Sequence, residues 1–137
     1  MTRWIACGAL AFCLLAANSA VALPPFPGLL GTALKEDADS KKFLDEVGKL
    51  TGMKKCDVCH KPGADKKAKD HGLNDFGEAM HKSVNFKDLK AAMGKKDDAA
   101  VAKLFKEGLT KATAEKNADG KTFGELIKAG TMPGKNG

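Results

Sequence analysis

The stretch Cys56-Asp57-Val58-Cys59-His60 is the part of the chain that decides its fold. Two thiols stand three positions apart, and the two-residue spacer lets both sulfur atoms reach one edge of a flat group. The imidazole of His60 follows directly and can bind a metal ion from one side. Because five positions act together in a fixed order, the pattern is specific. The rest of the chain must therefore cover whatever these three side chains hold.

The order C-x-x-C-H is the attachment signature of a covalent c-type haem. Cys56 and Cys59 would add across the haem vinyl groups as thioethers, and His60 would bind the iron as its proximal ligand. On these residues the chain resembles the c-type cytochromes, a family of haem electron carriers. The resemblance implies one covalent haem c as the cofactor.

The N-terminus has the features of a secretion signal. Arg3 supplies a positive end, and the apolar run from Trp4 to Ala17 is too short to span a bilayer comfortably. Ala20-Val21-Ala22 matches a small-x-small cleavage site. We therefore predict a signal peptide over residues 1–22 and export to the periplasm or an equivalent extracytoplasmic compartment. No integral membrane segment is expected after cleavage.

Two other kinds of site also use a C-x-x-C pair. A thioredoxin-like pair lies beside a βαβ pattern, and no segment of this chain shows the alternation of a strand. A zinc site needs two further ligands at similar spacing. Cys7 and Cys13 leave with the signal peptide, so the mature chain has no third cysteine. Haem is therefore favoured over both alternatives.

The mature chain is basic, and all its basic residues other than His are lysine. The whole chain has a net charge of +6, and loss of Arg3 leaves 22 lysines against 17 acids, a net charge of +5. Six lysines flank the motif: Lys54, Lys55, Lys61, Lys66, Lys67 and Lys69. They would form a positive collar that steers an acidic redox partner protein, although a solvated Lys-rich surface explains them equally well. The lack of mature Arg and the exported address argue against nucleic acid as a partner.

Composition divides the mature chain into an arm and a domain. Leu23 to Gly31 holds three prolines and two glycines, which predicts an extended arm rather than a helix, and we assign residues 23–39 to this arm. Residues 40–137 form the predicted monohaem domain. Apolar residues at helical spacing predict helices over 40–50, 74–83, 86–93, 97–115 and 122–129. The fold class is therefore all-α, a small cytochrome c-like domain wrapped around one haem.

Two helix starts carry the same dipeptide. Phe76-Gly77 opens one predicted helix behind the N-cap Asn74, and Phe123-Gly124 opens the last one inside a capping box, Thr122 to Glu125. In each, Phe would enter the core, and Gly would let another surface approach the backbone closely. The stretch Asn74 to Gly77, together with the closing stretch Thr122 to Gly134, is similar to small exported monohaem cytochromes of planctomycete-type bacteria.

The sixth iron ligand stays open. The candidates are Met80, His81, His71, Met53, Met93 and Met132. Met80 is on the apolar face of the helix 74–83, where methionine also serves as core packing, and His81 is its neighbour. Met132 in Thr-Met-Pro resembles the Met loop of class I cytochromes, but no helix follows it. His81 and Met80 rank level as distal ligands, and Met132 ranks third.

The sequence favours a soluble exported electron carrier whose haem edge exchanges electrons with a partner. An iron held on both faces suits that task, whereas an open sixth position suits binding of NO, CO or O₂. A haem-based gas-binding or sensing protein, also as a subunit of a heteromeric complex, is therefore the alternative. An enzyme such as a peroxidase is not expected, because a distal acid/base pair with Arg is missing.

Overall fold

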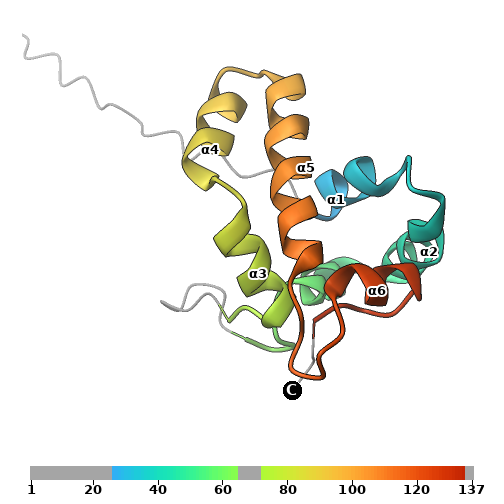
Figure 1. Cartoon of the computed structure of the whole chain (residues 1–137). Coiled ribbons are helices and arrows are strands. Elements are labelled where there is room, and N and C mark those ends of the chain that lie inside the picture. The colour runs from blue at the N-terminus through green and yellow to red at the C-terminus, as the bar shows by residue number, and fades with distance from the viewer. Residues whose placement is uncertain (1–25, 65–71, 135–137) are drawn as a thin grey trace, which may run out of the picture.

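The computed structural model describes residues 26–64 and 72–134, which form six α-helices and two 3₁₀-helices (Figure 1). In chain order these are α1 (Phe26–Leu34), η1 (Ala38–Ser40), α2 (Lys41–Lys49), η2 (Gly52–Val58), α3 (Asp75–Ser83), α4 (Phe86–Gly94), α5 (Asp98–Ala114) and α6 (Phe123–Lys128). β-Pairing in this part of the chain is limited to two isolated bridges, His60 with Leu73 and Lys116 with Thr122. The predicted all-α class is confirmed. Residues 1–22 lie outside the described ranges.

The longest helix, α5, lies at the centre of the fold. Figure 1 shows α3 and α4 on one side of it, α1 on the other and α6 below, and all four helices contact α5. The core is built from phenylalanine and aliphatic side chains, the largest fully buried ones being Phe43, Phe76, Phe105, Phe123, Leu89 and Ile127. The rings of Phe76 and Phe123 meet edge to face with centroids 5.4 Å apart, a contact worth about 1 kcal/mol beyond its buried area. The repeated Phe-Gly starts thus join α3 to α6.

The predicted extended arm is wrong where it covers α1. Pro27 is the second residue of this helix, where its missing N–H would have had no partner within the helix. Leu30 and Leu34 are buried in the core with 3% and 8% of their surface exposed. The ring of Phe26 lies 5.7 Å from that of Phe105 on α5. Burial of this apolar face outweighs the helix propensity lost to two glycines, so the segment belongs to the domain.

The other helices follow their predictions to within about two residues, and the two predicted caps, Asn74 and the Thr122–Glu125 capping box, are confirmed. Asn74, Asn85 and Asp97 each accept a hydrogen bond from a backbone N–H three residues on. The capping box also forms: the Glu125 N–H donates to the Thr122 hydroxyl at 3.1 Å, and the Thr122 N–H donates to the Glu125 carboxylate at 2.7 Å. Ser40 precedes α2, but its hydroxyl donates to Asp37 instead of capping the helix by its side chain.

None of the helices in the described part of the chain is both long and apolar enough to cross a bilayer.

Replacement of Leu30 by Ala tests whether α1 is part of the core. We expect the free energy of unfolding to fall by about 2–4 kcal/mol, because the side chain is buried and its loss leaves a cavity. Chemical denaturation measures it, with Leu29→Ala as the control, since Leu29 is only half-buried and should cost less. Equal and negligible losses in both variants would show that the segment behaves as a linker.

Candidate functional site

The five motif residues form one tight turn, residues 56–60, which we call the motif turn. η2 ends at Val58, and the N–H groups of Cys59 and His60 both donate to the carbonyl of Cys56, at 3.1 and 2.9 Å. Val58 is buried with 2% of its surface exposed, whereas both cysteines and His60 are half-buried. The turn is therefore anchored by its apolar residue, Val58.

The start of α3 holds this turn through Asn74, whose side chain is fully buried. The Nδ2 amide of Asn74 donates to the carbonyls of Asp57 and Val58 at 3.1 and 3.2 Å, with a longer contact of 3.4 Å to that of His60. The backbone N–H of Asn74 donates to the carbonyl of Cys59 at 3.0 Å. Four successive carbonyls of the motif thus find their donor at one residue.

Gly77 lets the turn and α3 come this close. A Cβ atom at this position would lie 2.0 Å from the carbonyl oxygen of Cys59 and 3.1 Å from the side chain of Leu73. The N–H of Gly77 also donates to the Asn74 side-chain oxygen at 2.9 Å. The sequence predicted a close approach at this glycine, and the surface that approaches is the backbone of the motif.

The segment that follows α6 covers the same point. Pro133 and Gly134 are buried, and a Cβ atom on Gly134 would lie 2.1 Å from the Nδ2 atom of Asn74. Residues 131–134, the C-terminal segment, turn back at Gly130, whose φ of 74° suits glycine. Met132 is half-buried against the core. The fold therefore brings the C-terminal segment to the residue that holds the motif turn.

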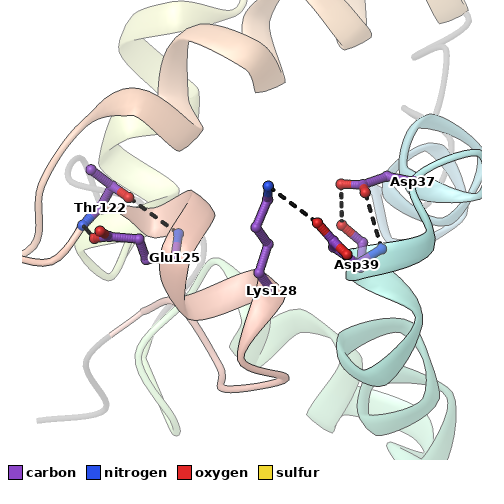
Figure 2. Close-up of polar contacts among 6 residues, drawn as sticks. Asp37, Asp39, Thr122, Glu125 and Lys128 are labelled. Carbon is purple, nitrogen blue, oxygen red and sulfur yellow. Dashed lines mark hydrogen bonds and ion pairs between the residues drawn. The ribbon is translucent and has the colours of Figure 1, made fainter.

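α6 is fixed mainly by its buried face. Phe123 and Ile127 are each about 2% exposed, while the ion pair of Lys128 with Asp39, 3.4 Å apart, joins two exposed side chains (Figure 2) and is worth at most about 1 kcal/mol. The Ser40 hydroxyl donates to Asp37 and holds the pKa of that carboxyl below its ordinary value. Apolar packing and the capping box thus set the path of the C-terminal segment.

The candidate distal ligands occupy different environments. Met80 is 3% exposed and belongs to the core, about one and a half helical turns beyond Asn74. His81 is exposed, and its ring stacks on Phe86 with centroids 5.2 Å apart. Met132 lies two residues before Gly134, and Gly134 packs against the Asn74 side chain that holds the motif turn. Met93 packs half-buried against the core, and His71 and the side chain of Met53 lie outside the described part.

The chemistry of the cysteine pair fits attachment of a haem. Cys56 and Cys59 are free thiols rather than a disulfide. Burial raises the pKa of the Cys59 thiol to about 12, and the neighbouring Cys56 adds to the shift. The described residues also hold no group of three or more His, Cys, Asp or Glu side chains placed to bind a metal ion.

The surroundings of the motif turn are basic. Lys54, Lys55 and Lys61 are exposed, and the remaining collar lysines lie outside the described ranges.

Two cavities of about 220 and 210 Å³ open beside α1 and α5, and neither is lined by the motif.

Comparison with known proteins finds no match to a family model, to a curated protein or to a solved structure. The function must therefore be argued from the residues of the motif turn and their contacts.

Sequence reasoning identified Asn74 only as a helix cap. Its contacts to the motif run to backbone atoms 14 to 17 residues earlier, and no pattern of side chains marks such partners. The contact of Gly134 with Asn74, 60 positions earlier, was missed for the same reason.

Replacement of Gly77 by Ala tests the close approach. The new methyl group would overlap the Cys59 carbonyl, so we expect a loss of about 1–3 kcal/mol in the free energy of unfolding. Gly48→Ala in α2 is the control, because nothing lies within 4 Å of its Cβ position, and it should instead stabilise the helix by about 0.5–1 kcal/mol. Similar effects of both substitutions would contradict the contact.

The capping box predicts a pH dependence. The Thr122 N–H donates to the Glu125 carboxylate and lowers the pKa of Glu125. A lowered pKa in the folded state contributes stability above the ordinary pKa, and this stability is lost as the pH falls through the folded-state pKa. The stability difference between the unmodified chain and Glu125→Ala should therefore narrow from about pH 6 to about pH 3.

Thermal unfolding across this pH range measures that difference, and Glu107→Ala controls for the loss of an exposed acid. A difference that stays constant down to the lowest pH would show that the ionised carboxylate does not cap α6.

Proposed function

We propose that the protein is an exported electron carrier that holds one haem c on Cys56, Cys59 and His60. The observation that carries the proposal is a pair of free thiols and an adjacent imidazole in one turn, whose backbone is fixed by buried hydrogen bonds. A bound haem would supply reversible one-electron oxidation and reduction. Residues 1–22, as a signal peptide, would take the chain to the compartment in which such proteins work.

The residues of the turn have separate tasks in this proposal. Cys56 and Cys59 hold the group through thioether bonds, and His60 binds the iron. Val58 anchors the turn in the core, and Asn74 and Gly77 keep its backbone against α3. A site held this rigidly changes little between two charge states, which favours fast electron exchange.

The first test is attachment. The chain, expressed with its signal in a bacterium that attaches c-type haem, should carry haem that survives denaturation. Cys56→Ser with Cys59→Ser should abolish it, and Ser83→Ala controls for a substitution away from the motif. Export of a chain without haem would contradict the proposal.

The distal ligand is the second test. We propose Met80 or His81, with Met132 third, and Met132 gains support from the contact of Gly134 with Asn74. Because Met80 is buried, its replacement should conserve volume: Met80→Leu, Met132→Leu and His81→Gln. One of these variants should convert the low-spin absorption spectrum to a high-spin one, and loss of a weak ferric band near the red end would indicate Met.

An open sixth position supports the alternative, a protein that binds NO or CO. Two observations favour this alternative, because both leading distal-ligand candidates already have other contacts: Met80 packs in the core, and the His81 ring stacks on Phe86. If the unmodified protein is high-spin or binds CO rapidly, gas binding replaces electron transfer as the better proposal. A low-spin spectrum unchanged by CO supports the carrier.

The exposed lysines predict steering by charge. Replacing Lys54, Lys55 and Lys61 by Gln should slow oxidation of the reduced protein by anionic ferricyanide, and added salt should slow it in the unmodified protein as well. Lys87, Lys90 and Lys95, also exposed, give a control triple with the same change in net charge. Stopped-flow absorption measures the rates. Equal slowing by both triples would show that only net charge matters.

A further inference from the structure

The Asn74 side chain makes more contacts than a helix cap needs. A cap needs an acceptor only, and Ser, Thr and Asp supply one as well as Asn does. The Oδ1 atom of Asn74 fills that role toward Gly77. The Nδ2 donor has no part in the cap, and it points instead to the carbonyls of Asp57, Val58 and His60.

We propose that Asn74 is a positioning residue that fixes the motif turn in the conformation that receives the haem. The inference rests on the proposed function for the identity of the group, but the fixed turn is a property of the chain itself. Carbonyl dipoles that converge on one point repel one another unless a donor lies between them, and burial makes an unpaired carbonyl costly. The Asn74 amide lies between the carbonyls and donates to them, so it reduces both their mutual repulsion and the cost of leaving them unpaired.

Gly134 packs against the Asn74 side chain from the C-terminal segment. Its Cα lies against the Asn74 amide, so that any side chain here would meet the Nδ2 atom. The C-terminal segment therefore holds the amide in place and excludes water from it. Asn74 joins three parts of the chain that are distant in sequence: the motif turn, the start of α3 and the C-terminal segment.

The main test compares Asn74→Ser with Asn85→Ser. Both substitutions exchange an Asn N-cap for a Ser that still caps, but the Asn85 amide donates to the exposed side chain of Asp88 rather than to buried backbone. The readout is hydrogen exchange of the Cys59 and His60 amides in the full mature chain without haem. We expect exchange at both amides to rise by about tenfold or more in Asn74→Ser and to stay unchanged in Asn85→Ser.

Two further variants separate the donor from the volume of the side chain. Asn74→Asp keeps the size and the cap but removes the donor, so exchange should rise as in Asn74→Ser. Gly134→Ala leaves Asn74 intact and displaces its amide, and Gly94→Ala is the control because nothing lies within 4 Å of its Cβ position. If Asn74→Ser fails to fold, Asn74→Asp and Gly134→Ala test whether the Asn74 amide protects the motif turn.

The fraction of chains that carry haem after export provides a second readout. It should fall several-fold in Asn74→Ser and in Gly134→Ala, and not in their controls. If the unmodified chain carries no haem, the proposed function fails, while hydrogen exchange still tests the role of Asn74. Unprotected Cys59 and His60 amides in the unmodified chain, or equal exchange in Asn74→Ser and Asn85→Ser, would overturn the inference.

Discussion

The fold depends on the pairing of buried backbone carbonyls in the motif turn. The carbonyls of this turn face the buried start of α3, where they need donors. Asn74 supplies these donors from its side chain and its backbone N–H. This arrangement places the start of α3 against the motif turn. Position 77 must then lack a side chain, because a Cβ atom there would overlap the Cys59 carbonyl. These hydrogen bonds join the motif turn to the start of α3, and α3 in turn packs on α5.

The second half of the chain returns to the same point. α5 runs through the centre and α6 packs back on it, with Phe123 against Phe76 of α3. The C-terminal segment then reaches Asn74 through Gly134. The start of α3 and the C-terminal segment, which are distant in sequence, thus meet at Asn74 beside the motif turn. The ion pairs lie at the surface between exposed groups and contribute little to this arrangement.

Local rules predicted much of this structure from the sequence. The helices α3 to α6, the Asn74 N-cap and the capping box follow from patterns that span a few residues, and the Phe-Gly starts behave as expected. α1 was missed because prolines and glycines have poor helix propensity, and only burial of Leu30 and Leu34 against distant helices outweighs it. The donor role of Asn74 and the contact with Gly134 depend on partners 14 to 60 positions away. Such long-range contacts to backbone leave no local signal.

The intact mass of the exported protein, measured under denaturing conditions together with its absorption spectrum, is the most direct test of the central claim. We expect one haem per chain, still attached after denaturation, and a low-spin spectrum in both oxidation states. Loss of the added mass on replacement of Cys56 and Cys59 by Ser would identify the attachment sites. An exported chain of unmodified mass, or a haem that dissociates on denaturation, would contradict the claim.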